Sequence, residues 1–564
     1  MVWAGLSREA AIALCAAVLC AFVVPFFYLG QGRTLTSHEA YLVVTTREMV
    51  DSGDWIVPRF GGLPRLTKPP LGYWSASLTA LALGGTTEFT CRLPAAISSV
   101  ALVALLGWWA MRWYGRAAGI CAMLIQTTTV YHTLYSREAT VDMLQCLLMT
   151  VCMFLVIEQP DPLTSADRWR ARGRWLAIYG LLGVLALAKF HFGPVLVVAP
   201  ILVYWIVDRQ PARFLNLFNP VGVLLFCAFA LSWPELILQR VDYAYAIWRH
   251  ETLGRAMGEM NREPAWHFLQ IIPSLAFPGI LLLPWMLRDS WLRSSQPIAP
   301  QETGNGRSHE RFLWTWIIVQ TVLLSLSANK HKNYIIPALP ALVLLLSPTL
   351  AAILQDLKTR QYQLPRWIPV VVVPGLLIGL SIVSLKVTRH WPMLQAPTLL
   401  LATTLLIGGC GLLWLLAQRK PALAGLTAVM LFLVSHTTMM GAMMPVRDYR
   451  LPAAEFARTL RKTHPNARIC LYGMGQSPVA YYMDDPMIRC ETDDDILPYL
   501  CKERDLLVLT IEPLITQLAP MGNVFVLETI PPHPATTHDT PNLVFLRYTA
   551  PASLSRTPPE SIWR

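Results

Sequence analysis

The sequence predicts a polytopic α-helical membrane protein with a small C-terminal α/β domain. Hydrophobic residues make up 54% of its 564 residues and charged residues only 14%, which is too apolar for an ordinary soluble protein. Apolar segments of about 20 residues, the length of a helix that crosses a bilayer, recur from Glu9 to Met444. Beyond Met444, short strand-like runs alternate with helical patterns, which is typical of a small α/β domain.

The apolar segments predict about thirteen membrane-spanning helices. The first, residues 10–29, lacks the A-x-A pattern at which a signal peptide is cleaved, so we expect it to stay in the protein. Several of the others are short or interrupted by proline and glycine. The predicted spans are centred near residues 20, 102, 126, 149, 182, 201, 227, 276, 319, 344, 376, 406 and 433.

The basic residues in the loops predict how the chain crosses the membrane. Placing the N-terminus in the cytoplasm puts residues 36–74, 243–265 and 327–333 and the whole C-terminal region outside the cytoplasm. The positive-inside rule also accounts for the net charge of +11, so we expect no binding to nucleic acid. The basic loops that this orientation places inside are residues 112–116, 168–174, 209–213, 288–293, 358–366 and 419–420.

The placement of charge along the predicted spans favours an enzyme over a transporter. Transporters more often carry ionisable residues near the bilayer midplane, whereas Asp142 and Lys189 fall at the outer ends of their spans. Four of the more polar stretches share the outer side, where several loops could build one active site. A transporter or flippase of lipid-linked sugars and a non-catalytic envelope assembly subunit are the alternatives.

The chain divides into a membrane domain of residues 1–446, with an outer catalytic loop at 31–75, and an α/β domain of residues 447–550. We expect the tail, 551–564, to be flexible. Helical patterns fall near 453–463 and 493–502. The predicted strands are residues 468–472, 505–511, 523–530 and 542–548.

The eleven cysteines define no metal site, because they show no C-x-x-C pair and no zinc spacing. Only Cys470, Cys490 and Cys501 lie in the polar C-terminal part. If that part is outside the cytoplasm, it could hold one disulfide and one free thiol.

The first outer loop supplies the first candidate residues. Glu39, beside His38, could act as a general base that takes a proton from an acceptor hydroxyl or amine. The structural alternative is a residue of the first helical turn, with Ser37 as N-cap. Lys68 precedes Pro69-Pro70, which fix the backbone and would hold the amine against a phosphate. The alternative for Lys68 is a lysine that snorkels at the membrane surface.

Later outer segments supply further candidates. Residues 327–334, SANKHKNY, place Lys330 and Lys332 on the side where lysine is disfavoured, and binding of an anionic lipid headgroup would explain them, with Tyr334 beside them. Arg137 and Asp142 could form an ion pair at a helix start or bind substrate. His250, Glu251 and Arg255 lie in a polar loop that could line a site or be solvated.

Taken in order, these stretches resemble the GT-C superfamily of glycosyltransferases that use lipid-linked sugars, in particular the bacterial aminoarabinose transferases of lipid A and the protein O-mannosyltransferases. The resemblance implies the GT-C fold and inverting transfer of a sugar from a polyprenyl phosphate, undecaprenyl phosphate in bacteria. It also implies a periplasmic active site on the inner membrane and an acceptor such as lipid A, another glycan or a protein. The matching stretches are SHEAYLVVTTREMVDSGDWIVPRFGG, TKPPLGYW, EFTCRLPAAIS, SREATVDM and SANKHKNYIIPALPALVLLL.

The resemblance also implies roles for single residues. The acidic pair of the family falls on His38 and Glu39, and its KPP motif begins at Lys68. The later lysine and tyrosine fall on Lys330 and Tyr334, which would hold the lipid phosphate. Two family carboxylates are replaced, by His38 and by Thr67 before the KPP motif. The base role therefore falls to Glu39 with His38, and a divalent metal, although allowed, has no assigned ligands.

Overall fold

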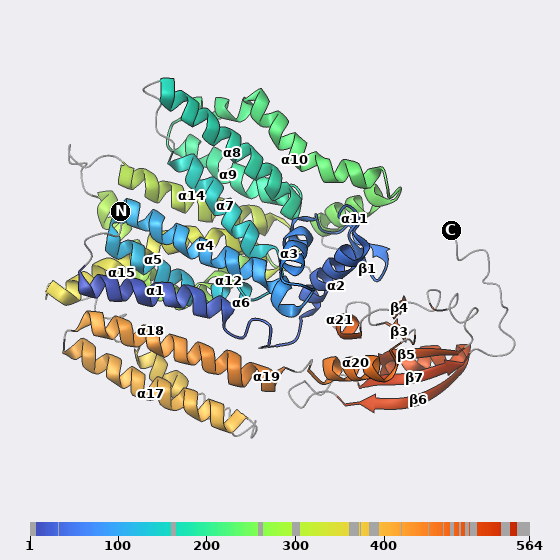
Figure 1. Ribbon diagram of the computed structural model, residues 1–564. Helices are drawn as coiled ribbons and strands as arrows, with labels where there is room; N and C mark the ends of the chain where they lie inside the picture. The colour runs from blue at the N-terminus through green and yellow to red at the C-terminus, as the bar shows by residue number, and fades with distance from the viewer. Residues whose placement is uncertain are drawn as a thin grey trace. The chain divides into compact units, whose positions relative to one another are not determined.

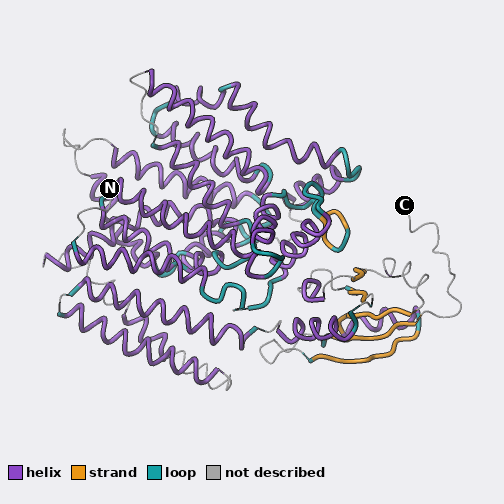
Figure 2. Tube along the Cα trace, in the orientation of Figure 1, coloured by secondary structure: helices purple, strands orange, loops and turns teal. Residues whose placement is uncertain are grey.

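The computed structural model divides the chain into two compact units. The membrane unit comprises residues 1–29, 66–75 and 92–442, and the α/β unit comprises residues 30–65, 76–91 and 443–564. Figures 1 and 2 show the helices and strands of both. The structure describes residues 7–31, 33–158, 165–257, 263–295, 305–359, 372, 374–382, 394–418, 420–448, 451–465, 467, 469–473, 479–483, 487–490, 496, 505–531 and 542–549.

Seven helices among the described residues are long and apolar enough to cross a membrane, or eight if a pair bent by 99° counts as one span. The predicted membrane class is therefore confirmed, while the predicted number of about thirteen spans is not. The centres near 149 and 201 fall on α7 (Asp142–Ile157) and α9 (Phe192–Val207), which are apolar but shorter. The other long helices are α1 (Arg8–Phe26), α4 (Glu88–Tyr114), α8 (Ser165–Lys189), α10 (Pro220–Leu238), α15 (Leu339–Thr359), α17 (Gln395–Ala417) and α18 (Pro421–Thr438).

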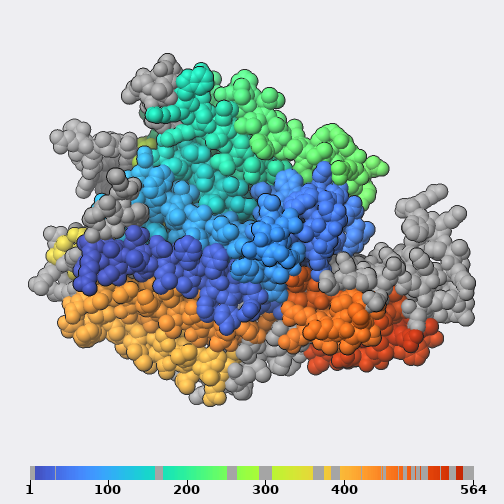
Figure 3. Space-filling view, in the orientation of Figure 1, coloured from blue at the N-terminus to red at the C-terminus, as the bar shows by residue number. Residues whose placement is uncertain are grey.

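Burial separates the helices at the centre of the membrane unit from those at its surface. In the span Lys332–Leu357, which contains α15, 78% of the residues are buried, so this helix is central. In α10 and α17 only 17% and 22% are buried, and their exposed apolar side chains suit contact with lipid tails. The first helix, α1, packs beside α18, as Figures 1 and 3 show.

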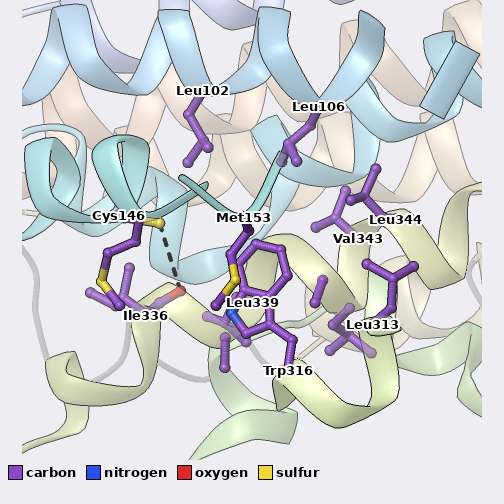
Figure 4. Packing of buried hydrophobic residues seen from close by; sticks show 14 of the residues in the cluster. Leu102, Leu106, Cys146, Met153, Leu313, Trp316, Ile336, Leu339, Val343 and Leu344 are labelled. Carbon is purple, nitrogen blue, oxygen red and sulfur yellow. Dashed lines mark hydrogen bonds between the residues drawn. The ribbon is translucent and has the colours of Figure 1, made fainter. Parts of the chain in front are cut away.

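The core of the membrane unit is closely packed around tryptophan and thiol side chains. Trp109 of α4 meets Phe154 of α7 edge to face, with ring centroids 5.1 Å apart, an arrangement that aromatic pairs favour. Figure 4 shows Trp316 of α14 (Asn305–Leu326) in the same cluster, where the thiol of Cys146 donates to the carbonyl of Ile336 at 3.8 Å. This packing fixes α7 and α15 relative to each other, and both helices lead to the candidate site.

The α/β unit contains a five-stranded sheet with strand order β4-β3-β5-β7-β6. Strands β4, β3 and β5 are parallel, whereas β7 pairs antiparallel with both β5 and β6. The four predicted strands are confirmed; β4, whose short sequence MIRC carries an arginine, was not predicted. Helix α20 (Leu451–Thr463) confirms the first helical pattern. The strands are β3 (Ile469–Tyr472), β4 (Met487–Cys490), β5 (Asp505–Ile511), β6 (Asn523–Ile530) and β7 (Leu543–Thr549).

Several C-terminal predictions fall on residues that the structure does not describe. The tail 551–564 and, apart from residue 496, the helical pattern near 493–502 lie outside the described residues, as does Cys501. Cys470 and Cys490, which are described, are both free thiols.

The α/β unit also includes two segments of the first outer loop, which a single boundary at residue 446 did not anticipate. The backbone amide of Thr34 donates to the carboxylate of Asp448, and the amide of Leu35 donates to the hydroxyl of Tyr482 at 2.9 Å. That hydroxyl donates in turn to Glu88 at 2.6 Å. Burial, helped by the charge of Glu88, raises the pKa of Tyr482, so its hydroxyl stays protonated and serves as the donor. These contacts join loop segments to the C-terminal domain.

Candidate functional site

One end of the membrane unit holds a cavity of about 470 Å³. Such a concave, mostly apolar space with a few polar groups is typical of a ligand site. The apolar wall includes Phe190, Phe192, Leu196, Pro234, Trp248, Leu324 and Leu326. The polar lining residues are Thr67, Lys68, Gln145, Lys189, His191, Ser327, Asn329 and Tyr334.

The turn between α8 and α9 brings a cation and an aromatic ring to the cavity. Lys189 ends α8 and Phe192 begins α9, so the chain reverses within two residues. Phe190 has a φ of 47°, a left-handed conformation that is uncommon for a bulky residue and costs free energy. Such strain is found most often at functional sites, and here it lies where both Lys189 and Phe190 line the cavity.

A buried ion pair holds Lys189 in place. Its ammonium group donates to one carboxylate oxygen of Asp142, and the amide of Asn333 donates to the other oxygen at 3.1 Å. The side chains of Asp142 and Lys189 are only 6% and 17% exposed. The ammonium also lies 5.4 Å from the centroid of the Tyr334 ring, a cation–π distance. This network joins α7, α8 and the 327–334 segment at the cavity.

Arg137 does not form the ion pair that was one of its two predicted roles. Its guanidinium donates to the carbonyls of Val24 and Pro25 at 3.0 and 3.3 Å, at the end of α1, where helix carbonyls have no partner within the helix. Asp142 pairs with Lys189 instead, because the fold places the end of α8 against the start of α7. Binding of substrate by Arg137 stays a prediction.

The KPP segment is fixed to the wall of the cavity by a tryptophan. Lys68 and Pro69 line the cavity, and the indole N–H of Trp248, from α11 (Ala244–Met257), donates to the carbonyl of Leu66 at 2.9 Å. The Trp248 ring also packs against Phe190, with centroids 6.0 Å apart. Trp248 therefore serves both as wall and as anchor for the segment that carries Lys68.

The two lysines of the 327–334 segment do not line the cavity. Lys330 is 3% exposed, and its ammonium donates to the carbonyl of Glu263 at 2.9 Å, while the Glu263 amide donates to Ala328 at 3.2 Å. Lys330 thus holds two loops together, and Lys332 is exposed. Of the three residues predicted here, the structure brings Tyr334 to the cavity.

The polar residues of α11 are only partly described. His250 is exposed, and the side chains of Glu251 and Arg255 lie outside the described residues. Their predicted part in substrate binding stays a prediction.

Glu39 and His38 belong to the α/β unit, at the start of α2 (Ser37–Ser52). The N-cap is Thr36 rather than the predicted Ser37, and Glu39 completes a capping box with it. The Glu39 carboxylate is fully buried and accepts from the guanidinium of Arg33 at 2.6 Å. His38 is exposed. This geometry gives Glu39 a structural role, and its role as a base stays a prediction.

Sequence reasoning missed several residues of the cavity. Lys189 was noted only as a charge at the outer end of a span, and Gln145, Asn329 and Trp248 were not singled out. The signal for Lys189 was present, since it is a lysine on the side where the positive-inside rule disfavours one. Among the described residues, no group of three or more His, Cys, Asp or Glu side chains is placed to hold a metal ion.

Residues 67–237 match a family model described as dolichyl-phosphate-mannose-protein mannosyltransferase. Two similar relatives are the undecaprenyl phosphate-alpha-4-amino-4-deoxy-L-arabinose arabinosyl transferases of Aeromonas salmonicida (strain A449) and Edwardsiella ictaluri (strain 93-146). The first is 27% identical and the alignment covers 62% of this chain and 63% of the relative. The second is 31% identical, with 58% and 57% covered. The matched region thus spans about three fifths of these relatives' length.

The fold matches a solved structure over nearly its whole length. The crystal structure of ArnT from Cupriavidus metallidurans bound to undecaprenyl phosphate superposes with a TM-score of 0.73 at 20% identity, covering 97% of this chain and 99% of that one. The chain therefore has the predicted GT-C fold, and the predicted resemblance to the aminoarabinose transferases is confirmed.

Proposed function

We propose that this chain is a membrane glycosyltransferase that moves a sugar from an undecaprenyl-phosphate donor to an acceptor on the periplasmic face of the bacterial inner membrane. The observation that carries the proposal is the cavity, where Lys68 and Lys189 lie beside an apolar and aromatic wall. Such a site suits a ligand with an anionic phosphate and a hydrocarbon tail. The names of the relatives and the donor lipid in the ArnT crystal structure support the same class of substrate.

In the proposed reaction, the lysines stabilise the departing phosphate. An acceptor oxygen or nitrogen attacks the anomeric carbon from the face opposite the phosphate, and the anomeric C–O bond breaks with inversion. The electron pair leaves with the phosphate as undecaprenyl phosphate, whose charge Lys68 and Lys189 balance. The ion pair with Asp142 and the anchor from Trp248 hold the two ammonium groups before the donor arrives, which lowers the cost of ordering them.

The charges of the loops support the proposed orientation. The residues that line the cavity come from segments that the positive-inside rule places outside the cytoplasm, notably 67–69 and 327–334. Lipid A, another glycan or a protein could supply the attacking group there.

The envelope of the bacterium provides the experiment that tests this function. Mass spectrometry of lipids, glycans and proteins from cells with and without the chain is expected to show one sugar modification missing, with the lipid-linked donor accumulating. Restoration by the wild-type gene should return the modification. Identical envelopes, including identical donor levels, would argue against the proposed function.

Replacing Trp248 by phenylalanine tests the anchor of the KPP segment. The ring is kept but the hydrogen bond to the Leu66 carbonyl is lost, which is worth about 0.5–1.5 kcal/mol. We therefore expect the KM for the donor to rise about 3- to 10-fold with little change in kcat. Steady-state kinetics check this, with W169F, at a tryptophan that is 71% exposed, as the matched control. An unchanged KM in W248F would show that the hydrogen bond does not position Lys68.

Replacing Glu39 by glutamine separates the catalytic role of this residue from its structural one. Glutamine can still close the capping box but cannot take a proton. If Glu39 is the base, transfer should fall by about 10²- to 10⁴-fold while donor binding is kept. The control is T36A, which removes the cap itself, costs about 1 kcal/mol of stability and should leave most of the activity. Near-normal transfer by E39Q would limit Glu39 to capping α2 and pairing with Arg33.

A further inference from the structure

Two buried carboxamides in the wall of the cavity have acceptor oxygens that the described residues leave unsatisfied. Gln145 of α7 is 2% exposed and Asn329 is 3% exposed, and both line the cavity. The Oε1 atom of Gln145 and the Oδ1 atom of Asn329 have no hydrogen-bond partner among the described residues. The Gln145 amide nitrogen meets only the sulfur of Met149, at 3.6 Å.

A third oxygen lies in the same wall. The hydroxyl of Thr67, next to Lys68, is buried and also lacks a partner among the described residues. A buried acceptor without a partner costs about 1–3 kcal/mol, so three in one cavity call for a ligand that donates hydrogen bonds. A carboxamide both donates and accepts, as a sugar hydroxyl does, which makes the two groups complementary. The faces of Phe190 and Trp248 supply an apolar surface beside them.

The charges in the cavity restrict what kind of sugar fits. Among the described lining residues, the ionic side chains are Lys68 and Lys189, and none is a carboxylate. The nearby carboxylate of Asp142 is already bound by Lys189 and Asn333. An ammonium group on the sugar would therefore meet like charge without a counter-ion, whereas a hydroxyl would not.

We propose that Gln145, Asn329 and Thr67 form the subsite for the donor's sugar, and that this subsite selects an uncharged, hydroxylated sugar over an amino sugar. The inference rests on the proposed function and adds to it the class of sugar. It sets this chain apart from the relatives that are named for transfer of 4-amino-4-deoxy-L-arabinose.

Binding of three lipids to the purified full-length chain in nanodiscs tests the subsite without knowledge of the acceptor. The lipids are undecaprenyl phosphate, its arabinose conjugate and its 4-amino-4-deoxyarabinose conjugate. We expect the arabinose conjugate to bind at least about tenfold more tightly than the bare lipid phosphate, as one or two hydrogen bonds would give. The amino sugar conjugate should bind no more tightly than the bare lipid.

Two variants locate the effect. Q145L and N329L should each remove most of the gain from arabinose while leaving affinity for undecaprenyl phosphate within about twofold, because the loss is confined to hydrogen bonds with the sugar. The matched control is Q126L, the same change at a buried glutamine of α5 (Arg116–Thr128) that does not line the cavity; it should keep the gain.

The outcomes separate this inference from the function on which it rests. Equal or tighter binding of the amino sugar conjugate by the wild-type chain would overturn the choice of sugar, even if neither variant folds. A gain that survives in both variants would overturn the subsite. If undecaprenyl phosphate itself does not bind, the proposed function fails, and the subsite with it.

Discussion

Replacing Lys68 by alanine is expected to lower kcat/KM for sugar transfer by about 10²- to 10³-fold, the usual effect of removing one group that stabilises developing charge. The ammonium lies in the cavity wall, where the low dielectric strengthens its attraction for the departing phosphate. Kinetics with the lipid-linked donor measure the effect. Because the group acts mainly on the leaving phosphate, kcat should fall more than donor affinity.

The control for Lys68 is another lysine of the same chain. Lys332 is exposed and does not line the cavity, so K332A should keep activity within about twofold, as is usual for a surface substitution. If K332A lowered transfer as much as K68A, the phosphate site would have to include the 327–334 segment, as the sequence alone predicts. If K68A kept nearly full activity, Lys68 would not contact the phosphate.

Replacing Asp142 by alanine is expected to destabilise the membrane unit by about 3–5 kcal/mol, because it leaves the ammonium of Lys189 in a buried site without its counter-ion. It also releases Asn333, which would loosen the segment that carries Tyr334. Unfolding followed in detergent measures the loss. Transfer should fall as well, since Lys189 would no longer be held at the cavity.

Two further variants make this result interpretable. Replacing both partners, as D142L with K189M, should recover much of the stability but not the activity, because a well-packed apolar pair removes the unpaired charge and the phosphate ligand together. R112A breaks the pair of Arg112 with Glu158, where Arg112 is 56% exposed, and should cost no more than about 1 kcal/mol. A D142A protein as stable as R112A would show that the Asp142–Lys189 pair contributes little.

The sequence predicted the features that depend on composition, periodicity and local motifs. The membrane class, four strands of the sheet and the cavity residues Lys68 and Tyr334 all follow from local patterns. The number of spans did not, since helices that are short or bent, such as α7 and the pair His267–Leu275 with Gly279–Ser290, have the composition of a span without its length or direction.

Side-chain partners could not be predicted, because they depend on which segments pack together. Asp142 and Lys189 are 47 positions apart, and only the packing of α7 against α8 makes them partners. Lys330 has the charge expected of a phosphate ligand but reaches the carbonyl of Glu263 instead. Glu39 shows the opposite case: its structural reading as part of a helix start was available from sequence and is present in the structure, with Thr36 as the cap.

The reaction of the purified chain in liposomes tests the central claim, that this is an inverting transferase using a polyprenyl-phosphate sugar, most directly. The reaction contains the undecaprenyl-phosphate sugar and the acceptor extracted from cells that lack the chain. We predict that undecaprenyl phosphate is released in equal amount to the sugar transferred, and that NMR shows the opposite anomeric configuration in the product. Movement of the intact donor across the bilayer without release of undecaprenyl phosphate, or a product of retained configuration, would contradict the claim.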